Sequence, residues 1–248
     1  MTKRLLRNLA LAVTSITLTL TGCSSTRSSD DEVLEELASL DKQTIFDRAE
    51  KLYADKEYVE ARKYFSFVYD TFPNDPLGHK AALRVADTYA AKSDPTSLTE
   101  ARLRYRDFAN RYPNDPDRDY ALLMVGHTYS SKKIRPDRDL SNLHEAFTAY
   151  QQLTTLYPNS RHVEEAQSRI TELRDTLAEH EWLVAQFYYR NKRWQGALWR
   201  LEYLQENYPE YSRIEEVNSQ VDQINSKIAE IGETYKKLLE ERRKSQER

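Results

Sequence analysis

The chain has 248 residues, of which 31% are charged and 39% hydrophobic; its 5 glycines are too few for the tight turns of all-β folds or for phosphate-binding loops. Its 17 tyrosines, 7 phenylalanines and 3 tryptophans argue against disorder, and its single cysteine excludes a disulfide framework. A net charge of −3 gives no reason to expect nucleic acid as a partner, so we expect an all-helical protein with short loops.

Residues 1–22 predict a cleaved signal peptide rather than part of the fold. Three basic residues precede a mostly apolar segment, 9–20, which is too short to span a bilayer. The segment runs into a motif that resembles the lipobox of bacterial lipoproteins: Leu20, Thr21, Gly22 and Cys23. The alternative is a secreted protein in which the lone cysteine follows the apolar segment by coincidence.

The lipobox resemblance implies that Cys23 carries an S-diacylglycerol and an N-acyl chain and becomes the first mature residue. Ser24 rather than Asp follows it, which in that family favours export to the outer membrane. Each buried methylene contributes about 0.8 kcal/mol, so such an anchor is permanent without a membrane-spanning helix. Residues 23–40 are then the lipidated cysteine and a polar tether. We expect localisation to the periplasmic face of the outer membrane, and no metal or other cofactor.

The next segment, residues 41–211, repeats one pattern in four recognisable copies. In the first and last copies, which start at Ala49 and Ala185, two alanines, two apolar residues and a proline recur with identical spacing. The two middle copies keep the second half of the pattern. All four close on an aromatic–proline pair: Phe72-Pro73, Tyr112-Pro113, Tyr157-Pro158 and Tyr208-Pro209. The pattern resembles the tetratricopeptide repeat, which implies a solenoid of four to five helix–turn–helix units.

The spacing also predicts where helices begin and end. Each proline after an aromatic residue ends a helix, because it has no N–H to donate. Asp75 and Asp115 each precede a proline, which predicts a helix N-cap at both positions. Apolar residues at alternating three- and four-residue steps predict one long helix over 161–190. The same rhythm predicts a long C-terminal helix and charged tail over 212–248.

The sequence offers little for catalysis. The five histidines have no metal-ligand spacing, and no phosphate-binding, dinucleotide or serine-nucleophile motif occurs. We therefore expect a binding protein rather than an enzyme.

Residues that could bind a partner lie at both ends of the repeat region. Tyr53, Tyr89 and Tyr129 could line a groove formed by the first helices of the pairs, although ordinary packing explains each of them equally well. Arg200 precedes the predicted core residue Leu201, so it should point off the packed face beside Trp199. The alternative for Arg200 is simple solvation.

Several motifs together resemble the BamD family, also called YfiO or ComL, of outer membrane assembly lipoproteins. They are the lipobox, a mature length of about 225 residues, the segments 135–140 and 157–160, the long helix with 181–188, and the segment 194–209. The resemblance implies a non-catalytic scaffold of the β-barrel assembly (BAM) machinery. Its implied partners are the periplasmic domains of a BamA-like barrel subunit, accessory Bam lipoproteins and unfolded outer membrane proteins. By position, Arg200 matches an arginine that faces the barrel subunit in that family. The alternative is another repeat lipoprotein, a scaffold for pilus or secretin assembly or for cell-envelope coordination.

Overall fold

The computed structural model describes residues 37, 39–131, 136 and 139–246. The predicted signal peptide and the four lipobox residues, Leu20, Thr21, Gly22 and Cys23, lie outside these residues, as does most of the predicted tether. Arg135 and most of the segment around it also lie outside them. The expectations for these parts of the chain therefore stay predictions.

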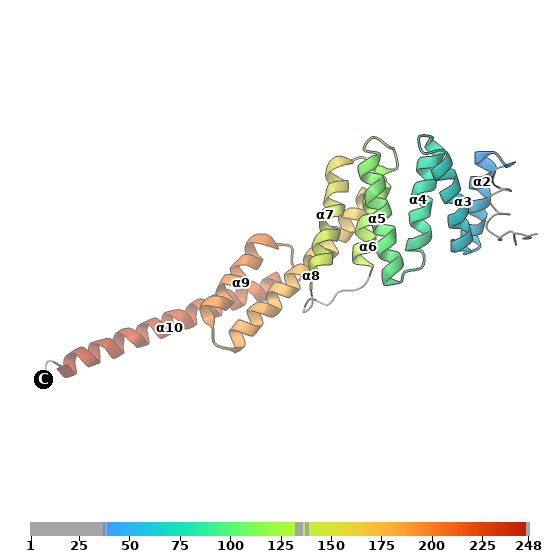
Figure 1. Ribbon diagram of the computed structural model, residues 1–248. Helices are drawn as coiled ribbons and strands as arrows, with labels where there is room; N and C mark the ends of the chain where they lie inside the picture. The colour runs from blue at the N-terminus through green and yellow to red at the C-terminus, as the bar shows by residue number, and fades with distance from the viewer. Residues whose placement is uncertain (1–36, 38, 132–135, 137–138, 247–248) are drawn as a thin grey trace, which may run out of the picture. The chain divides into compact units, whose positions relative to one another are not determined.

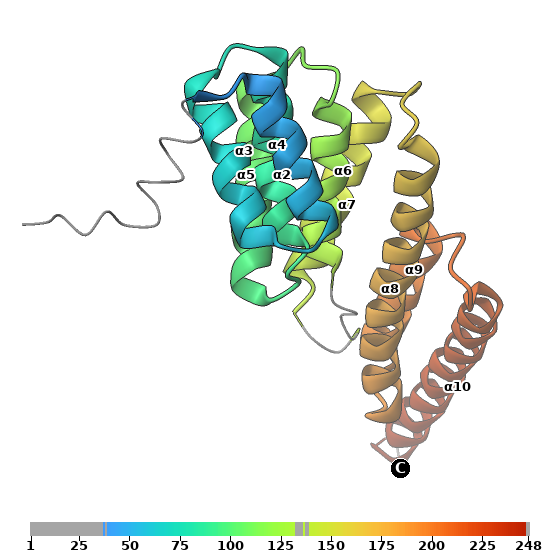
Figure 2. The ribbon, with the colours of Figure 1, turned by 90° about the vertical axis from the view of Figure 1, so that its right-hand side faces the viewer.

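Between residues 42 and 246, the described residues form nine helices and no strand. The helices are α2 (Lys42–Ala54), α3 (Tyr58–Thr71), α4 (Pro76–Ala90), α5 (Pro95–Arg111), α6 (Arg118–Ser130), α7 (Ser141–Leu156), α8 (Val163–Arg190), α9 (Trp194–Asn207) and α10 (Ile214–Gln246). Each helix packs on the next one along the chain, and α2 to α7 lie side by side in that order (Figures 1 and 2). The all-α class and the tetratricopeptide-like pairing of helices are confirmed.

Small residues let the two helices of each pair approach closely. Ala49 of α2 and Ala61 of α3 are both 0% exposed, and the equivalent alanines of later pairs are equally buried. In the third pair the first of these positions is Gly126, where the Cβ of any other residue would lie 2.3 Å from the ring of Tyr150. Tyr150 is itself 0% exposed. Its ring occupies the space that a side chain at Gly126 would need.

Four helices end at the aromatic–proline pairs, as predicted. The aromatic residue of each pair is the C-cap, and its backbone N–H donates to the carbonyl oxygen four residues earlier. The proline that follows cannot donate to the helix, so the chain turns there. The helices that end in this way are the second members of the pairs: α3, α5, α7 and α9.

Aspartates cap the starts of two helices. Asp75 accepts a hydrogen bond from Leu77 N at 2.9 Å, and Pro76 is the first residue of α4, as predicted. Asp94 caps α5 in the same way, through Thr96 N and Ser97 N, which the sequence analysis missed.

The predicted cap at Asp115 is wrong. Helix α6 begins at Arg118, and its N-cap residue is Asp117, which makes no side-chain capping bond. Asp115 instead accepts from Asp117 N at 2.9 Å, and its second oxygen lies 2.8 Å from His79 Nδ1 of α4. This aspartate therefore stabilises the turn before the helix and ties it to the preceding pair.

Helix α8 confirms the long helix predicted over 161–190, and it contributes to two hydrophobic cores. Its first half supplies Ile170, Leu173 and Leu177 to the core that includes residues of α4 to α7. Its second half supplies Trp182 and Ala185 to the core shared with α9 and α10. One continuous helix thus joins the third helix pair to the last one.

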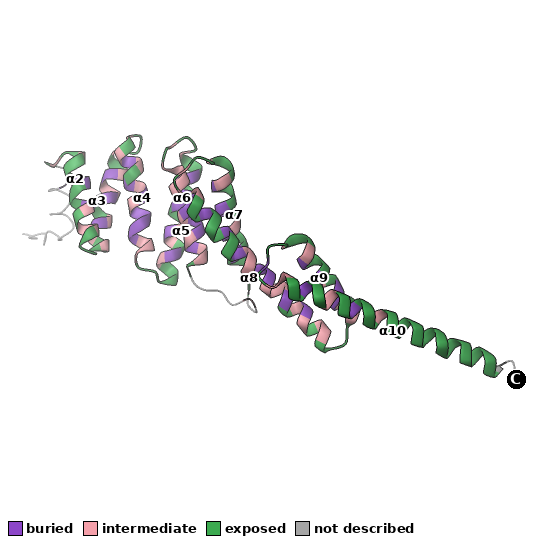
Figure 3. Cartoon of the chain, turned by 180° about the vertical axis from the view of Figure 1, so that it is seen from behind, coloured by how far each residue is buried: buried purple, intermediate pink, exposed green. Residues whose placement is uncertain are grey.

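Helix α10 carries the predicted apolar stripe, but only the first half of the stripe is covered. Val217 and Ile224 are 0% exposed and pack in the core that includes α9. Further along, Ile231, Tyr235 and Leu238 are 53%, 63% and 54% exposed, and Figure 3 shows this part of the helix as exposed. No helix between residues 42 and 246 is both long enough and apolar enough to cross a bilayer.

Candidate partner-binding surfaces

The three tyrosines predicted to line a groove lie on the first helices of three successive helix pairs. Tyr53, Tyr89 and Tyr129 lie near the C-terminal ends of α2, α4 and α6, and all three are half-buried. Their partial burial means that they contribute to packing, as the simpler interpretation holds. One face of each tyrosine ring is in contact with another side chain.

In all three cases that side chain is an arginine. The guanidinium carbon of Arg84 lies 4.0 Å from the ring centroid of Tyr53. The corresponding distances are 3.5 Å from Arg62 to Tyr89 and 4.2 Å from Arg102 to Tyr129. An arginine within about 6 Å of a ring face is attracted by the quadrupole of the ring. The sequence analysis missed these arginines. Two of them occupy equivalent positions that could have been detected: Arg62 and Arg102 each follow the buried alanine in the second helix of a pair.

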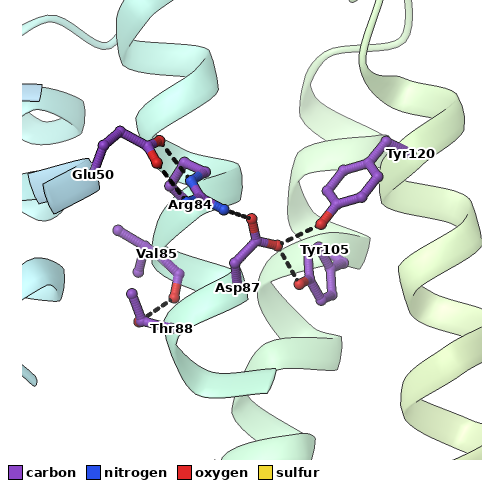
Figure 4. Close-up of polar contacts among 7 residues, drawn as sticks. All are labelled: Glu50, Arg84, Val85, Asp87, Thr88, Tyr105 and Tyr120. Carbon is purple, nitrogen blue, oxygen red and sulfur yellow. Dashed lines mark hydrogen bonds and ion pairs between the residues drawn. The ribbon is translucent and has the colours of Figure 1, made fainter. Parts of the chain in front are cut away.

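The first of these arginines belongs to a buried polar network that joins four helices (Figure 4). Arg84 of α4 donates to both carboxylate oxygens of Glu50 on α2, at 2.7 and 2.6 Å, and to Asp87 at 2.8 Å. The other oxygen of Asp87 accepts from the hydroxyls of Tyr105 on α5, at 2.6 Å, and Tyr120 on α6, at 2.9 Å. The network therefore fixes the first three helix pairs against one another.

The electrostatics of this network suit structure rather than proton transfer. Burial raises the pKa of the Tyr105 and Tyr120 hydroxyls, and the nearby Asp87 carboxylate raises it further, so both stay protonated donors. Burial opposes the charge of Arg84, but hydrogen bonds from it to Glu50 and Asp87 more than compensate and raise its pKa. With three donors on Asp87, this carboxylate has little capacity left for a ligand.

The second predicted surface, on α9, combines an exposed tryptophan with a constrained arginine. Trp199 is 62% exposed. The side chain of Arg200 is only 30% exposed, because its Nη1 donates at 2.8 Å to Glu181 Oε2 on α8 and its guanidinium lies 4.9 Å from the Trp199 ring centroid. Arg200 is thus more buried than an arginine pointing off the packed face would be.

Two details distinguish this surface from ordinary solvated packing. Arg200 Nε is buried and has no hydrogen-bond partner among the described residues. A buried donor left unpaired costs about 1–3 kcal/mol, so the bond to Glu181 does not fully satisfy the Arg200 side chain. A large apolar side chain is also exposed one turn further along α9, at Tyr203.

A hollow of about 870 Å³ lies beside α8, and charged side chains that line it are already paired among the described residues. Arg174 pairs there with Glu210 and donates to Asn207 O at 2.6 Å, while Asp175 accepts from Ser212 N at 3.0 Å. Among the residues that the structure describes, no group of three or more His, Cys, Asp or Glu side chains could hold a metal ion.

Comparison with protein families identifies the family to which the chain belongs. The family model described as outer membrane lipoprotein, YfiO, matches residues 39–237. The chain belongs to this family. The match includes α2 to α9 and most of α10, and therefore every candidate binding residue of both surfaces. Cys23 precedes the matched residues, so its lipidation stays a prediction that agrees with the description of the YfiO family.

Three curated relatives of this YfiO family member share one name. The chain is 40% identical over 76 residues to the outer membrane protein assembly factor BamD of Vibrio cholerae, which is 31% of this chain and 32% of the relative. It is 37% identical over 73 residues to BamD of Xylella fastidiosa, 29% of this chain and 25% of the relative. The BamD of Haemophilus influenzae is 32% identical over 76 residues, 31% of this chain and 29% of that protein. The alignments thus span about a third or less of each relative.

Proposed function

We propose that the chain is a lipid-anchored, non-catalytic scaffold of the machinery that assembles β-barrel proteins in the outer membrane. The observation that carries this proposal is the YfiO family match over residues 39–237, together with relatives named outer membrane protein assembly factors. The lipobox that ends in Cys23 supports attachment to the periplasmic face of the outer membrane.

The surface around Trp199 and Arg200 binds the periplasmic domains of a BamA-like barrel subunit in this proposal. Tryptophan and arginine are both among the residue types enriched in binding hot spots. Covering Trp199, now 62% exposed, removes apolar area from water and stabilises a complex by about 2–4 kcal/mol.

The face that carries Tyr53, Tyr89 and Tyr129 binds segments of unfolded outer membrane proteins. Repeated shallow contacts along successive helices suit an extended chain better than a single deep pocket. No nucleotide is needed, because a segment held weakly here leaves when strand pairing in the barrel becomes more favourable. Accessory lipoproteins of the same machinery are further partners, for which the half-exposed stripe of α10 offers a surface.

Purification of the native protein from detergent-solubilised outer membranes tests this function. We expect to recover a large β-barrel subunit with repeated periplasmic domains. Recovery of a secretin ring instead would favour a scaffold for secretin or pilus assembly.

Single substitutions then test the surface on α9. Trp199→Ala should weaken binding of the purified barrel subunit's periplasmic domains at least tenfold, as measured by interferometry, and should leave the melting temperature unchanged. Leu103→Ala is the matched control, because Leu103 is 53% exposed on α5. Equal losses for the two variants would refute the assignment of the surface to Trp199. Arg200→Glu is a less suitable probe, because it places a second carboxylate beside Glu181.

A further inference from the structure

Two of the arginine–tyrosine contacts are equivalent in sequence and in space. Arg62 on α3 stacks on Tyr89 of α4, and Arg102 on α5 stacks on Tyr129 of α6, at 3.5 and 4.2 Å from the ring centroids. In both cases the tyrosine lies 27 positions after the arginine, and the arginine directly follows the buried alanine of its helix. The contact is therefore repeated at the same place in consecutive helix pairs.

A third arginine extends this pattern. The guanidinium carbon of Arg104 on α5 lies 5.0 Å from the Tyr89 centroid, so two arginines share the Tyr89 ring. We call these five residues the cationic face: Arg62, Arg102, Arg104, Tyr89 and Tyr129.

The arginines of the cationic face are not neutralised within the described part of the chain. Arg62 donates to Thr88 Oγ1 at 2.9 Å and Arg102 to Thr99 Oγ1 at 3.3 Å, both neutral acceptors. Among the described residues, no carboxylate forms an ion pair with Arg62, Arg102 or Arg104. Arg84, over the third tyrosine, differs sharply, because two carboxylates hold it (Figure 4). Gathering three unpaired positive charges is costly unless an anion approaches them.

The geometry selects the kind of anion. A guanidinium carries five N–H donors in one plane, and Arg62 directs only two of its nitrogens to Thr88, so donors remain on it for the oxygens of a carboxylate. Helices α4 and α6 are neighbours, because Tyr120 of α6 donates to Asp87 of α4 at 2.9 Å. Both helices pack on α5, and alternate side chains on one face of an extended chain lie about 7 Å apart, so a segment of several residues suits two such pairs. A single phosphate group is too small to reach both arginine–tyrosine pairs.

We propose that the cationic face binds the acidic side chains of an extended polypeptide segment, with carboxylates at alternate positions facing the two arginine–tyrosine pairs. This inference rests on the proposed binding of unfolded chains to the same helices, and it adds a preference for acidic sequence. The tyrosine rings contact the aliphatic and backbone parts of the segment, while the arginines pair with its carboxylates.

Fluorescence anisotropy with the full mature chain in detergent micelles tests the proposal. The probe is a labelled, C-terminally amidated peptide in which glutamate alternates with threonine over twelve residues, and the reference peptide has glutamine in place of every glutamate. We expect the glutamate peptide to bind about tenfold more tightly at low salt and to lose this advantage as salt rises. Excess inorganic phosphate should not displace it.

Substitutions locate the effect. Arg104→Gln removes a charge that makes no hydrogen bond within the described residues, so the fold should survive, and binding of the glutamate peptide should weaken about threefold. The double variant Arg62→Gln/Arg102→Gln should abolish the difference between the two peptides. Arg106→Gln is the matched control, because Arg106 is exposed on the same helix and stacks on no ring among the described residues.

The outcomes separate this inference from the proposed function. Equal binding of both peptides would overturn the acidic preference and leave the binding of unfolded chains intact. Equal losses for Arg106→Gln and Arg104→Gln, or displacement by phosphate alone, would also overturn it. If neither peptide bound, the proposed binding of unfolded segments would fail as well.

Discussion

Two glycines in long helices should respond in opposite ways to the same substitution. At Gly126 of α6, the Cβ of alanine would lie 2.3, 2.5 and 2.6 Å from three ring atoms of Tyr150. At Gly232 of α10, no atom lies within 4 Å of such a Cβ. The helix backbone favours alanine over glycine by about 1 kcal/mol at both positions, so the difference between them isolates the contact with Tyr150.

The loss of stability expected for Gly126→Ala depends on the contacts of the Tyr150 ring. Its ring is 0% exposed, so it cannot turn into solvent, and overpacking of this kind costs about 1–3 kcal/mol. Displacing the ring also stretches the 3.0 Å hydrogen bond between its hydroxyl and Ser130 Oγ, which contributes about 1 kcal/mol. After the gain in helix propensity, Gly126→Ala should destabilise the fold by about 1–3 kcal/mol.

Urea and thermal unfolding followed by circular dichroism would measure both variants under one condition. Gly126→Ala should lower the melting temperature by about 3–10 °C, whereas Gly232→Ala should leave it unchanged or raise it slightly. Adding Tyr150→Leu to Gly126→Ala should cost less than the sum of the two single changes, because the smaller side chain relieves the overlap. If Gly126→Ala proved as stable as Gly232→Ala, the close approach of α6 and α7 would be contradicted.

Three further predictions concern the buried network, acid stability and the anchor. Tyr105→Phe should destabilise the fold by about 1.5–3 kcal/mol and Tyr120→Phe by less, because the shorter bond to the buried Asp87 carboxylate is lost; equal effects in chemical denaturation would contradict this. Burial lowers the pKa of His127 below 6.5, despite an opposing effect of Glu165, so the unfolded chain takes up the proton first and stability falls as the pH drops below about 6.5. His127→Gln should flatten the dependence of melting temperature on pH in that range, and an unchanged slope would show that other groups cause it. Cys23→Ser should move the protein from the membrane to the soluble periplasmic fraction while its helicity is unchanged, and retention in the membrane would exclude the lipid anchor.

Local chemistry explains why so much of the fold was predictable. Alanines that must lie between close helices recur with fixed spacing, and prolines can only follow a helix that has ended. Both signals depend on residues close together in the chain. They predicted the helix pairs and, through the long apolar rhythm, α8. The N-cap prediction at Asp115 failed because an aspartate that caps a helix and one that stabilises a turn have the same local sequence. The contact with His79 distinguishes them, and it is known only from the structure.

The binding surfaces depend on contacts between residues that are far apart in the chain. Arg84 reaches Glu50 from 34 residues away, and Tyr120 reaches Asp87 from 33. No local pattern distinguishes such an arginine from a solvated one. Arg200 shows the same limit, because its pairing with Glu181 depends on how α8 and α9 pack. Arg62 and Arg102 hold a repeated position that is detectable in the sequence, whereas the ring that each of them contacts became evident only in three dimensions.

Site-specific photo-crosslinking in cells tests the central claim most directly, that this chain acts by holding the barrel-assembly subunit through α9. A photoreactive amino acid replaces Trp199, which is 62% exposed, and in a control replaces Val59, which is 51% exposed on α3. We predict that irradiation links position 199 to a β-barrel subunit through its periplasmic domains, and that position 59 does not form this adduct. Crosslinks from position 199 to a secretin, or none to any barrel subunit, would contradict the account.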